Sequence, residues 1–121
     1  MVRGAADGVG LRRVFAVDSR GESCYNSSSQ TALKKQGVSV QPFKVGPDFI
    51  DPGYHTFYSG SISRNLDAWM MGNAGICEEG TSIGAGRISI VEGVMGLFDG
   101  SDVKSEEGST MALARLLKWP I

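Results

Sequence analysis

The chain has 121 residues, 41% of them hydrophobic, and a formal net charge of −1 at pH 7. This length suits one small domain and excludes two, and the near-neutral charge excludes the basic surface that nucleic-acid binding requires. The chain has no apolar run long enough to cross a membrane, and residues 1–10 lack the apolar core of a secretory signal.

The first part of the chain is predicted to form a βαβ unit. An apolar run predicts a buried strand over residues 11–17, and a polar turn follows over residues 18–29. Residues 31–36 are compatible with a helix that ends at Gly37. Alternating apolar side chains predict a second strand over residues 38–43. Such a unit favours a parallel sheet with a right-handed crossover.

The second part of the chain contains three further predicted elements. Helical spacing of apolar residues predicts a short helix over 63–71, whereas residues 72–86 are rich in glycine and weakly patterned. Residues 87–91 predict a third strand, and residues 110–119 predict a closing helix capped by Ser109. Three strong strands are fewer than the usual five or six, which suggests a fragment or a domain that needs a neighbour.

The stretch after the second strand is the first candidate site. Its prolines and glycines are expected to forbid both helix and regular strand over residues 46–53. We therefore predict a stiff loop at a strand end that carries one cation, Lys44, and two carboxylates, Asp48 and Asp51. Open α/β sheets bind ligands at the carboxyl ends of their strands, which favours a site. The alternative is an ordinary surface turn, in which these residue types are common.

The turn after the first strand is the second candidate. Gly21-Glu22-Ser23 matches the end of the phosphate-binding loop G-x-x-x-x-G-K-S/T, whose backbone amides cradle phosphates. The first glycine is absent, and Glu22 stands at the lysine position. That charge reversal is expected to weaken phosphate affinity by about a hundredfold even after screening. An ordinary polar turn is the alternative.

The third candidate follows the third strand. Glu92 stands at the strand end and resembles the acid that organises Mg²⁺ in nucleotide hydrolases. Gly93 and Gly96 would let the backbone approach a ligand closely. The alternative is a strand cap followed by a glycine turn.

Four stretches carry a specific resemblance in their order and spacing. They read QPFKVGPDFIDPGYHT over residues 41–56, SRNLD over 63–67, EGVMGLFDG over 92–100 and GST over 108–110. Together they resemble the amino-terminal synthetase domain of the cobyrinic acid a,c-diamide synthases, across residues 31–120. Hydrogenobyrinic acid and nickel-sirohydrochlorin a,c-diamide synthases share these signatures. Dethiobiotin synthetase belongs to the same wider group but lacks the Pro-Asp-Phe-Ile-Asp-Pro loop.

The resemblance implies a fold and a reaction. The fold is a truncated α/β domain of the P-loop NTPase class, similar to dethiobiotin synthetase, with a parallel sheet flanked by helices. The reaction uses ATP and Mg²⁺ to activate the a and c carboxylates of a corrinoid as acyl phosphates, which ammonia then attacks. Glutamine supplies the ammonia through a separate amidotransferase domain that is missing from residues 1–121. A homodimer or a partner amidotransferase is also implied.

The resemblance and the strand-end positions together imply roles for individual residues. The catalytic candidates are Lys44, Asp48, Asp51 and Glu92; the nucleotide-binding candidates are Gly21, Ser23, Gly93 and Gly96; the metal ligands are Ser23, Asp48 and Glu92; and the substrate-side candidates are Tyr54, His55, Arg64 and Asn65. His55 is the single histidine, and a packing role in the loop explains it equally well.

Two departures from the family pattern shape the functional prediction. Glu22 replaces the lysine of the phosphate-binding loop, and residues 78–86 drift where the family has a helix. We therefore predict a partial ligase domain with impaired nucleotide binding. One alternative is a non-catalytic remnant that keeps a corrinoid- or partner-binding surface around residues 54–65. Another is a partitioning-type ATPase, which predicts a basic surface that the net charge does not supply.

The two cysteines bear on the cellular location. Cys24 and Cys77 have neither metal-ligand spacing nor a partner motif. We therefore expect free thiols and a reducing compartment, the cytoplasm; a disulfide between the two is the alternative.

Overall fold

The computed structural model describes the backbone of residues 5–6, 12–16, 23–82, 87–102 and 104–120, and the side chains from residue 28 onward within these ranges. The elements in chain order are β1 (Ala5–Ala6), β2 (Arg12–Ala16), α1 (Ser23–Lys35), β3 (Val40–Val45), α2 (Ile50–Ser59), β4 (Arg64–Leu66), α3 (Ala68–Ser82), β5 (Ile88–Glu92) and α4 (Thr110–Leu117). None of these helices is long and apolar enough to cross a membrane.

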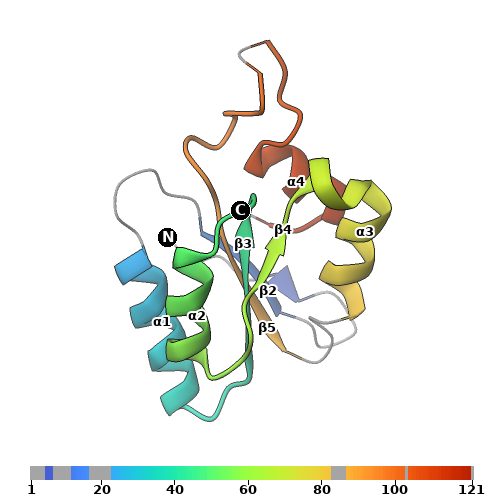
Figure 1. Ribbon diagram of the computed structural model, residues 1–121. Helices are drawn as coiled ribbons and strands as arrows, with labels where there is room; N and C mark the ends of the chain where they lie inside the picture. The colour runs from blue at the N-terminus through green and yellow to red at the C-terminus, as the bar shows by residue number, and fades with distance from the viewer. Residues whose placement is uncertain (1–4, 7–11, 17–22, 83–86, 103, 121) are drawn as a thin grey trace.

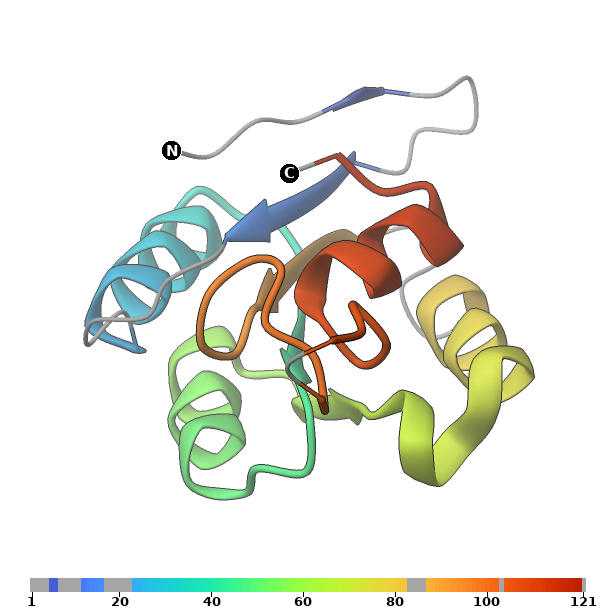
Figure 2. The ribbon, with the colours of Figure 1, turned by 90° about the horizontal axis from the view of Figure 1, so that it is seen from above.

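The strands form one sheet with helices on both faces. The strand order is β1-β2-β5-β3-β4, in which β1 pairs antiparallel with β2 and every other pair is parallel. Helices α1 and α2 cover one face, and α3 and α4 cover the other (Figures 1 and 2). The connections to β3 and β4 run one way across the sheet and the connection to β5 runs back, so right-handed crossovers place their helices on opposite faces. The predicted α/β class with a parallel sheet is confirmed and is consistent with the P-loop NTPase type.

The apolar core lies between the sheet and the α3–α4 face. Phe43, Leu66, Ile76 and Val91 are fully buried there, and the ring of Trp119 packs 5.8 Å from that of Phe43. Side chains alternate across a strand, so the pleat that turns Phe43 into this core turns the next residue of β3 toward α2. The sheet therefore separates an apolar side from a side that carries charge.

The prediction that residues 46–53 exclude helix was wrong. Helix α2 begins at Ile50 and includes Pro52 and Gly53. Pro52 is the third residue of the helix, and the first-turn amides have no intrahelical acceptor, so its missing N–H costs nothing there. The only loop in this stretch is the short segment between Val45 and Ile50.

The predicted helix over residues 63–71 was also wrong in its first part. Arg64–Leu66 form the short edge strand β4, which pairs with Phe43–Val45 of β3. The helix begins only at Ala68, and it extends to Ser82 through a break at Gly72, whose φ is 67°. Tertiary pairing outweighed the helical spacing, and the first part of the glycine-rich stretch, residues 72–82, belongs to α3.

Other elements agree with their predictions, with shifted ends. The predicted helix over residues 31–36 is the end of a longer helix, α1, and Gly37 follows it with a φ of 76°. The predicted polar turn over residues 18–29 was therefore wrong from Ser23 onward, where the helix begins. Ser109 caps α4, because its hydroxyl accepts a hydrogen bond from the Ala112 amide at 3.0 Å. Cys77 is a free thiol, as predicted; the side chain of Cys24 lies outside the described residues.

Candidate functional site

Lys44 lies at the carboxyl end of β3 and joins three elements through its ammonium group. Its Nζ donates to Asp51 Oδ2 at 3.0 Å, to Glu92 Oε1 at 3.0 Å and to the Gly93 carbonyl at 3.2 Å. Asp48 Oδ2 lies 3.9 Å away. The register explains the meeting, because Lys44 and Glu92 are direct partners across the parallel β3–β5 pair. All three ammonium hydrogens are thereby used.

The charge of Lys44 is stabilised by this arrangement. Its side chain is only 6% exposed, and burial alone would lower its pKa. Hydrogen bonds to Asp51 and Glu92, together with their negative charges, outweigh burial and raise the pKa above its ordinary value. A raised pKa stabilises the fold at every pH below the ordinary lysine value, and this contribution is lost only as the pH rises through the raised pKa. Lys44 is therefore a fixed cation at neutral pH.

Glu92 is held at both carboxylate oxygens. Oε1 accepts from Lys44, and Oε2 lies 2.6 Å from His55 Nε2. The Glu92 side chain is 6% exposed and the His55 side chain is fully buried. A buried carboxylate with two opposed partners has a fixed orientation, so this acid is part of a rigid network.

The segment between β3 and α2 is held by Asn65 on the neighbouring strand β4. Its Nδ2 donates to the Gly46 carbonyl at 2.8 Å and also to the Asp48 carbonyl. Asp48 Oδ1 in turn accepts from the Ile50 amide at 2.9 Å, where α2 begins. Asn65 therefore fixes the path of the backbone that carries Asp48.

Replacing this amide should loosen the segment. In Asn65→Leu two carbonyls lose their donor, and we expect the free energy of unfolding to fall by about 1–3 kcal/mol in urea titrations. Asn73→Leu is the matched control, because Asn73 is exposed on α3 and should change stability by less than about 0.5 kcal/mol. Equal losses in the two variants would contradict this role for Asn65.

The glycines after β5 accommodate side chains of this chain. A Cβ on Gly93 would lie 2.9 Å from Thr110 Oγ1, and one on Gly96 would lie 2.8 Å from Asp99 Oδ2. The Gly96 amide also donates to Asp99 Oδ2 at 2.9 Å. The absence of a Cβ at these two positions therefore serves the packing of the loop, and their contact with a nucleotide stays a prediction.

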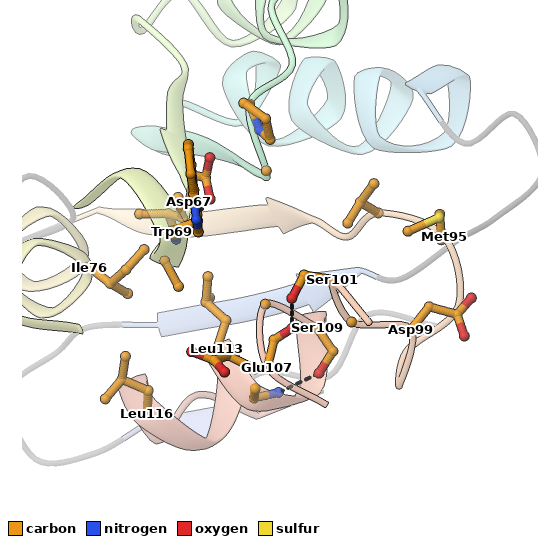
Figure 3. A pocket seen from close by; sticks show the side chains of 18 of the residues that line it. Asp67, Trp69, Ile76, Met95, Asp99, Ser101, Glu107, Ser109, Leu113 and Leu116 are labelled. Atoms are coloured by element: carbon orange, nitrogen blue, oxygen red, sulfur yellow. Dashed lines mark hydrogen bonds between the residues drawn. The ribbon is translucent and has the colours of Figure 1, made fainter. Parts of the chain in front are cut away.

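A cavity of about 650 Å³ opens beside the segment between β3 and α2, beyond the ends of β3, β4 and β5. Figure 3 shows Asp67 and Trp69 on one side of it and Leu113 and Leu116 of α4 on the opposite side. Asp99 also lines it. Sequence reasoning missed these lining residues, although Asp67 and Asp99 lie within two of the quoted motifs. Asp67, Trp69 and Asp99 lie in loops or at the start of a helix, and no spacing rule indicates which way such residues point.

The four substrate-side candidates are not brought together around this cavity. Tyr54 is exposed on α2, and Arg64 Nη1 lies 3.6 Å from Glu79 Oε1 at the surface. His55 is buried against Glu92, and Asn65 holds the β3–α2 segment. Their substrate roles stay predictions, and the contacts described here assign structural tasks to the latter two.

The predicted nucleotide and metal ligands are described only in part. Gly21 lies outside the described residues, and Ser23 begins α1 without a described side chain. Across the described ranges, no three histidine, cysteine, aspartate or glutamate residues are grouped so that they could hold a metal ion. Both Glu92 oxygens already have partners, so the arrangement is not a preformed metal site.

The chain is similar in sequence to three curated synthases. It is 45% identical over 104 residues to the cobyrinate a,c-diamide synthase of Picrophilus torridus, covering 85% of this chain and 23% of that protein. It is 49% identical over 90 residues to the synthase of the same name from Clostridium acetobutylicum, covering 74% and 20%. It is 41% identical over 113 residues to the hydrogenobyrinate a,c-diamide synthase of Streptomyces coelicolor, covering 91% and 23%.

Other comparisons add nothing to these. No family model matches the chain, and no solved structure matches it significantly. The aligned part spans about a fifth of the length of the curated relatives. Identity of this level over most of the chain shows common descent, so the chain is a homologue of one segment of the cobyrinate a,c-diamide synthase family.

Proposed function

We propose that this chain is part of a domain for ATP-dependent amidation of the a and c carboxylates of a corrinoid acid, and that it binds ATP with an affinity impaired by Glu22. The observation that carries the proposal is the buried Lys44 ammonium, fixed by two carboxylates at the carboxyl ends of two parallel strands. Neither Lys44 nor its acidic partners line the cavity described above, which opens at the same edge of the sheet. Ligands of open α/β sheets bind at that edge. The names of the similar proteins, cobyrinate and hydrogenobyrinate a,c-diamide synthases, support the substrate class.

The proposed reaction has two steps. A substrate carboxylate oxygen attacks the γ-phosphorus of ATP, and ADP leaves, which gives an acyl phosphate. The nitrogen of ammonia then attacks the acyl carbon, inorganic phosphate leaves, and a proton is lost. Phosphoryl transfer depends mostly on positioning and charge stabilisation. Lys44 would exchange one of its present partners for a phosphoryl oxygen and stabilise the charge that develops there.

The acids around Lys44 support a requirement for Mg²⁺. One ammonium faces three carboxylates, those of Asp48, Asp51 and Glu92, within 3.9 Å. A triphosphate would add further negative charge, so a divalent cation accompanying the nucleotide would relieve the repulsion. Asp48 and Glu92 carry the oxygen donors that Mg²⁺ prefers, although Glu92 would have to give up Lys44 or His55 to bind the ion. Ser23 is the third proposed ligand. No step of the reaction is assigned to the metal.

Further partners follow from the same proposal. The nitrogen donor is ammonia or glutamine, and glutamine would require an amidotransferase partner to release ammonia. A homodimer is a second proposed assembly. The proposed location is the cytoplasm, where ATP is available.

Calorimetric titration of the purified chain with ATP and Mg²⁺ tests the proposal. We expect saturable binding in the presence of Mg²⁺ and at least about tenfold weaker binding with EDTA, because the surplus of carboxylates then faces bare phosphates. Lys34→Met, on the exposed end of α1, is the control and should leave the affinity unchanged. Absence of ATP binding under both conditions would overturn the nucleotide-dependent function.

Exposed aromatic side chains favour a second candidate, a non-catalytic corrinoid- or partner-binding surface. Phe57 is 78% exposed, and Tyr54 and Ile62 are also exposed, all within residues 54–65. Large apolar side chains at the surface are typical of interaction sites. Titration with a corrinoid acid without ATP discriminates the two: binding that Phe57→Ser weakens, in a chain that does not bind ATP, would support this candidate.

A further inference from the structure

We propose that His55 is a positioning residue that holds the Glu92 carboxylate, and through it the Lys44 ammonium, in one orientation. Any effect on catalysis rests on the proposed function, but the positioning itself is a property of the folded chain. The observation behind the proposal is that this buried histidine contacts the Glu92 carboxylate through Nε2.

The contacts place His55 behind the reactive cation. His55 Nε2 lies 2.6 Å from Glu92 Oε2, and Glu92 Oε1 lies 3.0 Å from Lys44 Nζ. The two oxygens of one carboxylate are thus divided between α2 and β3. Rotating the carboxylate would break one bond or the other among three side chains that are no more than 6% exposed. His55 therefore limits Glu92 to the orientation in which Lys44 is bound.

The hydrogen bonds also indicate which nitrogen carries the proton. His55 is fully buried, and its Nδ1 has no hydrogen-bond partner among the described residues. A proton on Nδ1 would be a buried donor without an acceptor, whereas a proton on Nε2 is donated to Glu92. This assignment, made from the hydrogen bonds, makes Nε2 of His55 the donor to Glu92.

Helix α2 supplies two partners of the network from one face. Asp51 and His55 are four residues apart on α2 and therefore lie one above the other. Asp51 binds Lys44 directly, whereas His55 contacts Glu92, which in turn binds Lys44. A shift of α2 relative to the sheet would disturb both contacts, so the histidine also couples the position of the helix to the position of the ammonium.

Three substitutions of His55 separate positioning from packing. In His55→Gln the amide nitrogen reaches about as far as Nε2 and can still donate to Glu92, whereas His55→Leu fills the space without a donor. His55→Asn, which is polar but too short to reach Glu92, is the third variant in case the leucine variant fails to fold.

Proton exchange of the Lys44 ammonium, measured by nitrogen-15 NMR of the full chain, is the readout. The resonance is assigned by its absence in Lys44→Met. We expect slow exchange in the wild type and in His55→Gln, and exchange at least about tenfold faster in His55→Leu or His55→Asn, because the ammonium loses a fixed partner. Core amides should remain protected in every variant. Unchanged Lys44 exchange in His55→Leu or in His55→Asn would overturn the proposal.

Turnover provides a second readout that separates this inference from the proposed function. Where the wild type hydrolyses ATP, His55→Leu should lower kcat by about tenfold to a hundredfold with little change in KM, and His55→Gln should restore it. A wild type that neither binds nor hydrolyses ATP would overturn the proposed function alone, since the exchange experiment needs no nucleotide.

Discussion

Lys44→Met should lower the free energy of unfolding by about 3–5 kcal/mol and abolish ATP turnover. The variant keeps the length of the side chain but leaves Asp51 and Glu92 without the cation that binds both at 3.0 Å. Breaking a buried pair from one side costs more than the pair contributes, because the remaining carboxylates lose the opposite charge that stabilised them in a buried site. Urea unfolding at neutral pH measures the stability, and phosphate release from ATP measures turnover. Lys44→Ala should abolish turnover in the same way.

A matched control and a double variant make this prediction specific. Lys35→Met removes an exposed lysine at the end of α1 and should change stability by less than about 0.5 kcal/mol. Adding Glu92→Gln to Lys44→Met removes the negative charge of the carboxylate that has lost its cation. The double variant should therefore recover part of the stability but none of the turnover. Turnover at the wild-type rate in Lys44→Met would contradict the catalytic role of the residue.

Phe43→Ala should be comparably damaging for a different reason. The ring is fully buried in the core and packs against Trp119. Its removal should cost about 3–5 kcal/mol through lost burial and the cavity left behind. Thermal unfolding monitored by circular dichroism measures the loss, and the near-ultraviolet signal should also change because Trp119 loses its neighbour.

Phe57→Ala is the control for this second prediction. Phe57 is 78% exposed on α2, so the same chemical change should cost less than about 0.5 kcal/mol. Equal losses at the two positions would show that residue 43 is not a core residue, and the described sheet would then be wrong.

The sequence predicted the positions of Lys44 and Glu92 at strand ends better than it predicted the elements around them. Lys44 and Glu92 were predicted as candidates because each ends a predicted strand, and their meeting needed only that the two strands be parallel neighbours. The glycines and prolines of residues 46–53 led to the wrong prediction that this stretch excludes a helix. Pro52 looked like a helix breaker, yet it occupies a first turn where a missing amide hydrogen has no consequence.

The contact between His55 and Glu92 escaped prediction because it joins residues 37 positions apart. A signal for it existed in the sequence. Asp51 and His55 are spaced i, i+4, and recognising α2 would have placed both on one face toward Lys44. Strand β4 had no such signal, since three residues become a strand only by pairing with β3. Local spacing cannot reveal an element that a distant partner creates.

The central place of β5 in the sheet has a consequence for synthesis. This strand inserts between β2 and β3, which leave the ribosome long before it does. A nascent chain that ends before residue 88 lacks the strand that joins the β1–β2 pair to the β3–β4 pair. The edges of β2 and β3 that β5 will cover are then free to pair with other strands. Such late, long-range pairing is slow to form. The acid that binds Lys44 is delivered by the same strand, so closure of the sheet and completion of the charged cluster are one event.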